Sequence, residues 1–289
     1  MLFNSFDFAV FLAVSWPIYR AIQARRLPRL VWLLAISAFF YGCWKPWYLT
    51  LIAASTVIQY YVGARIHAAA TDKGRTRWLV AGILSDVALL GTFKYGNFLL
   101  ANLDSVFQLL NLGPGAPIPR LPTELPVGIS FYTFQTLSYI IDIHRKRIQP
   151  RGSLLDFAVY VFFFPQLVAG PIVRAADFLP QLDKRPRLDW KAIGEGIFLI
   201  LAGLTKKMVL ADSLHHFVVE PFFKQVGAHN TLEVLYVVWA ANFQVYCDFS
   251  GYTDVATGAA LLFGFTLPLN FNRPFWSQTP MEHWRRWHI

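Results

Sequence analysis

Charged residues and cysteines are both scarce in this sequence, and each shortage excludes a class of protein. Lysine, arginine, aspartate and glutamate make up 15% of the 289 residues, whereas a typical soluble domain carries about 25%. The two cysteines, Cys43 and Cys247, are too few for a disulfide framework or a cysteine-based metal cluster. The composition therefore argues against a soluble domain and against a protein held together by cysteine chemistry.

Apolar side chains are abundant instead, with 55% hydrophobic and 17% aromatic residues. Runs such as 30–41, 49–62 and 197–204 lack the polar face that a soluble amphipathic helix needs. A membrane-spanning helix needs roughly 20 mostly apolar residues. The N-terminus has no basic region of the signal-peptide kind, so its first apolar run is predicted to be a retained helix. The predicted helices are 3–21, 30–44, 49–66, 78–103 and 125–143, then the shorter or broken segments 157–173, 193–204, 232–246 and 256–269.

The cations lie in short loops between the apolar runs, although the net charge of +9 could by itself suggest nucleic acid. Basic loops follow the helices expected at 3–21, 49–66 and 125–143. Cytoplasmic loops carry an excess of lysine and arginine, and such residues favour an anionic leaflet. We therefore predict no nucleic-acid partner, a multi-pass membrane protein, and a periplasmic N-terminus. The Pro- and Gly-rich stretch 113–117 is predicted to be an outside loop.

The pattern changes after residue 151, where apolar segments become short and are interrupted. Pro165, Gly170 and Pro171 fall within the segment 157–173, which is predicted to be either a kinked helix or a re-entrant loop. The predicted fold is all-α: a polytopic transmembrane helical bundle with short, broken or re-entrant helices around a tunnel. Residues 1–289 form a single integral membrane domain in this prediction, with N-terminal transmembrane helices in 1–151 and the start of a tunnel-forming core in 152–289.

Polar residues within the apolar segments are the first candidates for a site. Thr133 and Gln135 are expected to make hydrogen bonds between helices. Asp248 directly follows an apolar run and is the strongest candidate for a buried carboxylate, with Arg273 as a possible partner. Gly251 is expected to end that helix, and Asp254 to cap the next one. The surrounding sequence is not a G-x-S-x-G motif, so no hydrolase serine is predicted there.

A short helix is predicted near the end of the sequence. Thr279 is the expected N-cap and Glu282 its capping-box partner. Continuing this helix to the last residue would put Trp284 and His288 on one face and would pair Glu282 with Arg286. An aromatic, cationic helix of this kind suits a membrane interface. On these grounds alone His288 is either an interfacial or a catalytic histidine.

Four motifs of the chain together resemble the membrane-bound O-acyltransferase (MBOAT) family. They are LPVGISFYTFQTLSY at 125–139, FPQLVAGPIVR at 164–174, YCDFSGYTD at 246–254 and WRRWHI at 284–289. Within the family, the members that acetylate polysaccharides such as alginate are most similar, and those that transfer D-alanine to teichoic acid are more distant. The resemblance implies a multi-pass protein of the bacterial inner membrane, with a tunnel between a cytoplasmic acyl donor and an extracytoplasmic acceptor.

The resemblance also assigns roles to residues. His288 matches the first of the family's two tunnel histidines and is the candidate catalytic residue. The second histidine, in a Trp-His-Gly context, would follow Ile289, so the chain is expected to be an N-terminal portion that is inactive alone. No metal or bound cofactor is expected. The candidates for tunnel or substrate binding are Asp248, Ser250, Tyr252, Asp254, Asn272, Arg273, Trp284, Arg285 and Arg286.

The resemblance implies O-acetylation of an exopolysaccharide such as alginate, with acetyl-CoA or another acyl thioester as donor substrate. Histidine is the natural general base for a hydroxyl acceptor near neutral pH, and Arg285 and Arg286 would attract the phosphates of a CoA-type donor. The expected partners are the lipid bilayer, periplasmic acetyltransferase proteins and the polysaccharide. The alternatives are D-alanyl transfer to teichoic acid, or a transporter or scaffold without enzymatic activity.

Overall fold

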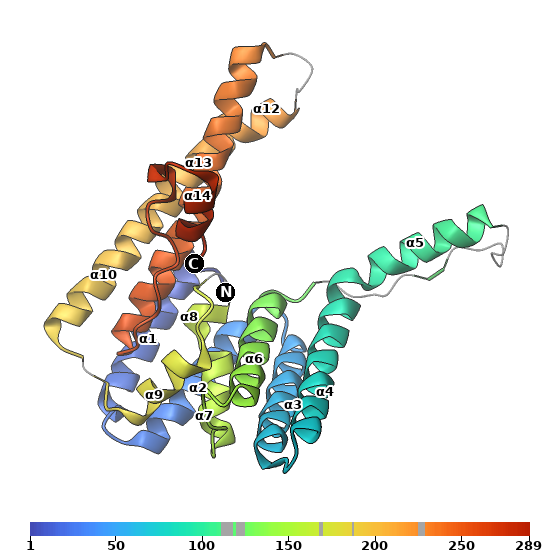
Figure 1. Ribbon diagram of the computed structural model, residues 1–289. Helices are drawn as coiled ribbons and strands as arrows, with labels where there is room; N and C mark the ends of the chain where they lie inside the picture. The colour runs from blue at the N-terminus through green and yellow to red at the C-terminus, as the bar shows by residue number, and fades with distance from the viewer. Residues whose placement is uncertain (111–117, 120–124, 168–169, 187, 225–228) are drawn as a thin grey trace. The chain divides into compact units, whose positions relative to one another are not determined.

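The computed structural model describes residues 1–110, 118–119, 125–167, 170–186, 188–224 and 229–289. Within these residues the regular structure is helical, and the only strand-like pairing is a single bridge between Phe271 and Trp287. The all-α prediction is therefore confirmed for the described part of the chain (Figure 1). The outside loop expected at 113–117 lies outside the described residues.

The chain forms two compact units. The first comprises Met1–Trp44, Phe163–Val173 and Asp177–Ile289, and the second comprises Lys45–Phe162 and Arg174–Ala176. These units follow contacts between residues, and the domain division predicted from the sequence stays a prediction.

The second unit is a helical bundle in which α3, α4 and α6 pack together and α7 packs against α3. Its elements are α3 (Tyr48–Ala68), α4 (Asp72–Leu90), the π-helix η1 (Gly91–Tyr95), α5 (Gly96–Leu109), α6 (Ile129–His144) and α7 (Leu154–Phe162). Two helices in the described chain are long and apolar enough to cross a membrane: Tyr48–Ala68 and the continuous Asp72–Leu109. The helices predicted at 49–66 and 78–103 are thereby confirmed as apolar helices of spanning length.

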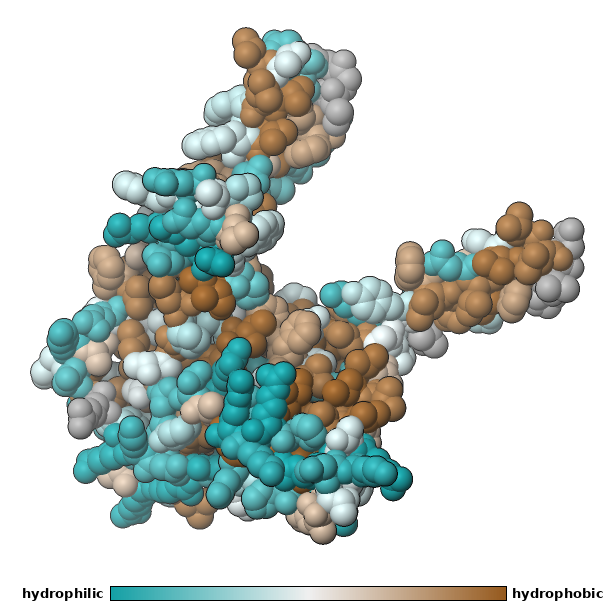
Figure 2. Space-filling view, viewed as in Figure 1, coloured by the Kyte–Doolittle hydropathy of each residue, from teal (hydrophilic) through white to brown (hydrophobic). Residues whose placement is uncertain are grey.

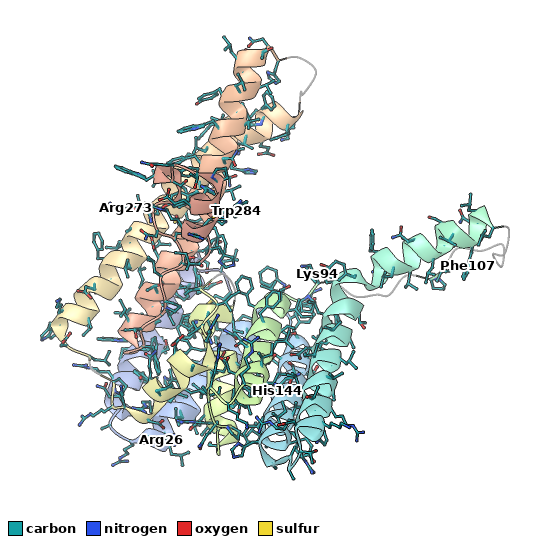
Figure 3. All side chains as sticks on the ribbon, in the orientation of Figure 1. Arg26, Lys94, Phe107, His144, Arg273 and Trp284 are labelled. Carbon is teal, nitrogen blue, oxygen red and sulfur yellow. The ribbon has the colours of Figure 1, made fainter. Side chains whose placement is uncertain are left out.

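The basic loops of the second unit meet at one end of it. The Arg75 guanidinium, in the first turn of α4, donates to the carbonyls of Ile143 and His144 at 3.1 and 3.0 Å. Hydrophilic side chains gather at this end, where Figure 3 labels His144, and hydrophobic ones cover α5 (Figures 2 and 3). Two of the three basic loops that are predicted to share one side of a membrane, those after 49–66 and 125–143, thus lie together in this unit.

A buried polar cluster joins the three packed helices of the second unit. The Asp86 carboxylate is 2% exposed and accepts hydrogen bonds from Thr136 at 2.9 Å and Ser55 at 3.4 Å. Thr136 thus makes the interhelical hydrogen bond to α4 that the sequence predicts for Thr133 and Gln135. The side chains of Thr133 and Gln135 are buried with no hydrogen-bond partner in the described part of the chain. Sequence reasoning missed Asp86, although a carboxylate inside an apolar crossing is an expected sign of a polar contact.

The first unit is built around two long helical segments that pack side by side (Figure 1). One segment is α10 continued by η2, and the other is α13. Two further helices, α1 and α2, pair with each other, and short elements complete the unit. Its elements are α1 (Phe6–Ile22), α2 (Arg26–Gly42), α8 (Phe164–Leu167), α9 (Ala175–Asp183), α10 (Trp190–Leu204), the π-helix η2 (Thr205–Ala211), α11 (Asp212–Leu214), the π-helix η3 (His215–Val219), α12 (Glu220–Lys224), α13 (Thr231–Leu262), the 3₁₀ helix η5 (Pro274–Trp276) and α14 (Pro280–Arg286).

The C-terminal end of α13 is fastened to α1 by side chains that donate to backbone carbonyls. Trp16 Nε1 donates to the Leu262 carbonyl, and the Tyr19 hydroxyl donates to the Phe263 carbonyl, both at 2.7 Å. These carbonyls belong to the last residue of α13 and to its C-cap, where no intrahelical donor remains for them. The contacts therefore satisfy the end of α13 and hold α1 against it.

The prediction that Gly251 ends a helix is wrong, because α13 runs unbroken from Thr231 to Leu262. Gly251 instead allows α13 to approach α10 closely: a Cβ atom added there would lie 2.7 Å from the Gly203 carbonyl oxygen. Gly258 faces Gly196 in the same way, at 2.4 Å. Small residues at helix contacts let backbones approach in this manner. Asp254 consequently lies inside a helix and caps none.

The broken segment expected at 157–173 is interrupted as predicted. α7 ends at Phe162, Phe163 is not helical, and α8 covers only Phe164–Leu167. Residues 168–169 of this motif lie outside the described residues. Whether the segment is re-entrant in a membrane stays a prediction.

Candidate active site

The C-terminal segment folds back against the residues that follow α13. Asn272 donates its backbone N–H to the Arg286 carbonyl at 2.8 Å, and Ile289 donates to the Asn270 carbonyl at 2.9 Å. The Phe271–Trp287 bridge lies between these two bonds. This short antiparallel pairing brings residues 270 and 288 side by side.

The helix α14 has the predicted N-cap at Thr279, but the capping box is not formed, because the Glu282 carboxylate accepts from the Gln278 N–H at 2.9 Å and not from the Thr279 N–H. The helix also ends earlier than expected. The Thr279 hydroxyl accepts from the Glu282 N–H at 3.2 Å, and Glu282 pairs with Arg286 at 2.5 Å. The helix ends at Arg286, and His288 has a positive φ of 47°. The predictions that the helix continues to the last residue, and that Trp284 and His288 share a helical face, are therefore wrong.

His288 is held by a chain of hydrogen bonds that leads to α13. Its Nδ1 lies 2.7 Å from Asn270 Oδ1, and Asn270 Nδ2 donates to Thr253 Oγ1 at 3.0 Å. Asn270 is buried, with 1% of its surface exposed. The His288 ring also packs on Phe249, with 4.9 Å between ring centroids. Partial burial lowers the pKa of His288 from its ordinary value, because a charged imidazolium is less well solvated there.

A small cavity of about 240 Å³, lined by both polar and apolar side chains, opens beside this chain of hydrogen bonds. Thr253 and Asn270 line it, together with the ion pair between Lys206 and Asp254, whose charged atoms lie 2.5 Å apart. The Ser250 hydroxyl, also at the cavity, is buried and has no hydrogen-bond partner in the described part of the chain. The cavity thus combines a cation, a carboxylate and neutral polar groups next to the partner of His288.

A second ion-pair group lies on the same two helices. Lys207 Nζ is 2.5 Å from Asp248 Oδ1 and 2.6 Å from Asp212 Oδ1, and it lies 5.4 Å from the centre of the Tyr252 ring. Lys207, and not Arg273, is therefore the partner of Asp248. Both lysines belong to the π-helix η2, a wider helical turn of the kind that often occurs at functional sites.

The remaining candidates lie at the surface around α14. Arg273 has a left-handed backbone with φ 49°, Trp284 is 70% exposed, and Figure 3 labels both in this region. Asn272 and Arg285 are also exposed. The structure therefore places Ser250 and Asp254 at the cavity that Asn270, the partner of His288, also lines, and it leaves these four residues outside the cavity.

Sequence reasoning missed Asn270, Thr253 and the two lysines of η2. The lysines carry a visible signal, because they close an apolar run and carboxylates occur in a neighbouring run. Asn270 carries no such signal, since only the pairing of the two segments brings it to His288.

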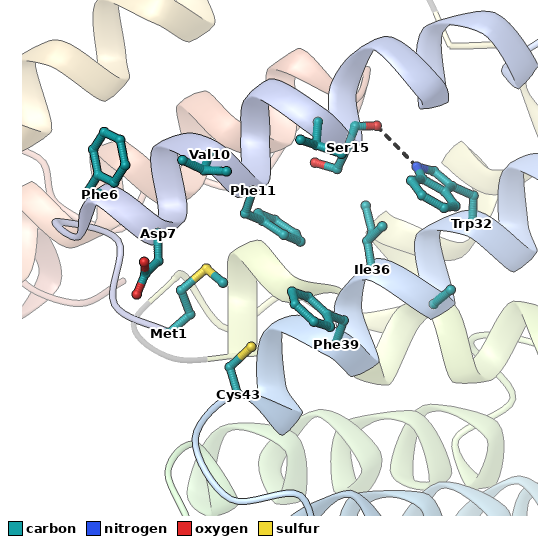
Figure 4. Close-up of a pocket in the computed structure, with 12 residues that line it drawn as sticks. Met1, Phe6, Asp7, Val10, Phe11, Ser15, Trp32, Ile36, Phe39 and Cys43 are labelled. Carbon is teal, nitrogen blue, oxygen red and sulfur yellow. Dashed lines mark hydrogen bonds between the residues drawn. The ribbon is translucent and has the colours of Figure 1, made fainter.

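The first unit also holds a larger and mainly apolar cavity of about 770 Å³ between α1 and α2. Figure 4 shows Phe11, Ile36 and Phe39 among its lining residues, and the bond from Trp32 Nε1 to the Ser15 carbonyl at 3.1 Å. Its described lining residues do not bring together a base, a nucleophile and an oxyanion donor, so we do not assign catalysis to it.

Within the described residues the chain is helical, has two apolar helices of membrane-spanning length, and holds a histidine through an asparagine that lines a small cavity. Comparison with known families supplies the class: residues 127–289 match the membrane-bound O-acyltransferase family, MBOAT. The chain belongs to this family.

Among individual relatives, a peptidoglycan O-acetyltransferase of Helicobacter pylori is 35% identical over 321 residues, covering 100% of this chain and 59% of that protein. A probable alginate O-acetylase, AlgI, of Pseudomonas aeruginosa is 38% identical over 293 residues, covering 100% and 54%. A teichoic acid D-alanyltransferase of Streptococcus thermophilus is 30% identical over 168 residues, covering 56% and 40%. The chain spans about half the length of the curated relatives it matches. The acyltransferase family and the similarity to polysaccharide O-acetylases predicted from the motifs are thus confirmed.

Proposed function

We propose that this chain carries a histidine site of an O-acyltransferase that moves an acetyl group from a thioester to an acceptor hydroxyl, for delivery to a polysaccharide. Membership of the MBOAT family supports acyl transfer, and the relatives named for acetylation of alginate and peptidoglycan support acetyl and a polysaccharide. The observation that carries the proposal is the hydrogen bond between His288 Nδ1 and the buried Asn270, which lines the small cavity. It gives the family histidine a fixed place next to a space for a small substrate group.

The chemistry that this arrangement suits is general-base catalysis. In the proposed step the acceptor hydroxyl gives its proton to His288 Nε2 as its oxygen attacks the thioester carbonyl carbon. The tetrahedral intermediate then collapses, the carbon–sulfur bond breaks, and the departing thiolate takes the proton from the imidazolium. The lowered pKa of His288 favours the neutral ring that accepts the proton. Lys206 or the Ser250 hydroxyl at the cavity is suited to stabilise the developing oxyanion.

The proposal extends to topology and donor. The chain would be part of a polytopic bundle around a tunnel in the bacterial inner membrane, one integral domain over 1–289 with a periplasmic N-terminus. An acyl thioester such as acetyl-CoA would bind from the cytoplasm, where the exposed Arg285 could pair with its phosphates. A periplasmic acetyltransferase would receive the acetyl group and complete its transfer. The basic end of the second unit supports the cytoplasmic assignment, since Arg75 joins two basic loops there.

Alginate is the acceptor that we favour, on the similarity to the probable alginate O-acetylase. The 30% identity to the teichoic acid D-alanyltransferase supports a second candidate, transfer of D-alanine to teichoic acid. A cavity of about 240 Å³ has room for either acyl group. Separate assays with acetyl and D-alanyl donors distinguish the two.

The test is transfer of labelled acetyl from a thioester in membranes from cells that express the protein from its own gene. We expect acetyl incorporation into polysaccharide, and its loss by at least about 100-fold in His288→Ala. His216→Ala is the matched control, because that side chain is 73% exposed on η3 and touches no part of the cavity. Full turnover in His288→Ala would remove the role proposed for this histidine. Substrate movement without donor consumption would indicate a transporter, and complex formation without transfer would indicate a scaffold.

A further inference from the structure

The hydrogen bonds around Asn270 have a direction that reaches from α13 to the imidazole ring. The Thr253 hydroxyl donates its proton to the Phe249 carbonyl, one turn earlier in α13, at 3.0 Å. A hydroxyl has a single proton to give. The contact between Thr253 Oγ1 and Asn270 must then be a bond that Thr253 accepts, so the NH₂ group of Asn270 faces Thr253.

This orientation of the amide fixes the tautomer of the histidine. With its NH₂ group turned to Thr253, Asn270 presents its carbonyl oxygen to His288 Nδ1 at 2.7 Å. A carbonyl oxygen only accepts, so Nδ1 carries the proton and the lone pair of the neutral ring is on Nε2. We propose that Asn270, oriented by Thr253, is the positioning residue that sets His288 in the Nδ1-protonated tautomer and so makes Nε2 the proton-accepting atom. This inference rests on the proposed acyl transfer.

The structure also favours a neutral partner over a carboxylate. Asn270 is 1% exposed and is fixed by its backbone as well, because its carbonyl accepts from Ile289. Side-chain substitutions therefore leave the backbone pairing in place. An amide holds the ring without adding a negative charge, whereas a carboxylate at this distance would favour the imidazolium and raise the pKa of His288.

The test is the pH dependence of acetyl transfer in the full protein with Asn270→Asp, Asn270→Ala and Thr253→Val. We expect the acidic limb of kcat/KM to move up by about one pH unit in Asn270→Asp. In Asn270→Ala kcat should fall about 100-fold with KM nearly unchanged, because the variant misplaces the His288 base but leaves substrate binding intact. Thr253→Val should lower kcat about tenfold, and Thr253→Ser, which keeps the hydroxyl, should restore it.

Asn242→Asp is the matched control, because it adds the same charge at an exposed position of α13. Within the described residues, the Asn242 side chain donates a hydrogen bond only to the Val238 carbonyl. Its pH profile should match that of the unmodified protein. An unchanged profile in Asn270→Asp, with Thr253→Val fully active, would overturn the positioning role while leaving acyl transfer in place. Full activity of His288→Ala would instead overturn the proposed function itself.

Discussion

The close contact of α10 with α13 gives the sharpest stability prediction. A Cβ atom at position 203 would lie 2.5 Å from the Gly251 carbonyl oxygen and 2.8 Å from the backbone nitrogen of Val255, where 3.4–4 Å is ordinary contact. Both neighbours are backbone atoms, so neither can swing away, and Gly203→Ala must push the helices apart by about 1 Å. Overpacking of this kind costs about 1–3 kcal/mol. Alanine regains up to about 1 kcal/mol through its better helix propensity.

The net expectation for Gly203→Ala is a loss of about 1–2 kcal/mol in the free energy of unfolding. Gly194→Ala, in the same helix, is the control, since a Cβ atom there meets nothing within 4 Å; it should be neutral or stabilising by up to about 1 kcal/mol. Thermal unfolding of the two variants in the same detergent, followed by tryptophan fluorescence, should separate their Tm values by several degrees. Equal Tm values for the two variants would refute the assignment of Gly203 to a tight helix contact.

Three further outcomes are expected. Lys207→Met should lower stability by about 1 kcal/mol because it leaves Asp248, 34% exposed, and Asp212 without their cation. Adding Asp248→Asn should recover part of the loss in the same unfolding assay. The acidic limb of the pH–rate profile of acetyl transfer should have its midpoint below pH 6.5, because burial lowers the pKa of His288 and keeps the base neutral to lower pH. A midpoint above pH 6.5 would contradict this. In the second unit, Asp86→Leu should lower the free energy of unfolding by about 1–3 kcal/mol, because it removes the acceptor of the Thr136 hydroxyl. Asp86→Asn keeps an acceptor oxygen and should be nearly neutral. Equal Tm values for the two variants would count against a structural hydrogen bond.

Features that depend on neighbouring residues in the sequence were predictable. The apolar helices follow from runs of the right length, and the N-cap at Thr279 follows from the residues that directly surround it. The Glu282–Arg286 pair depends only on spacing within one helix turn. Each of these requires no knowledge of the rest of the fold.

Features that depend on a second segment were not predictable in this way. Gly251 was expected to break a helix, because the intrinsic cost of glycine is visible in the sequence and the Gly203 backbone against it is not. The sequence suggests Arg273 as the partner of Asp248, whereas the packing of η2 on α13 supplies Lys207. His288 was placed on a helix, since the sequence does not show that 286–289 pairs with 270–272.

The helix contact and the candidate site are connected through α13. This helix carries Gly251 for the close approach to α10, Asp254 for the ion pair with Lys206, and Thr253 for the bond that orients Asn270. These residues lie within four positions, so a displacement of α13 by about 1 Å at Gly251 also moves Thr253. Since a misplacement of that size can cost about 100-fold in rate, Gly203→Ala should lower kcat of acetyl transfer well beyond its effect on the amount of folded protein. Gly194→Ala should leave kcat unchanged, and a Gly203→Ala enzyme with normal kcat per folded molecule would show that the packing of α10 on α13 does not reach His288.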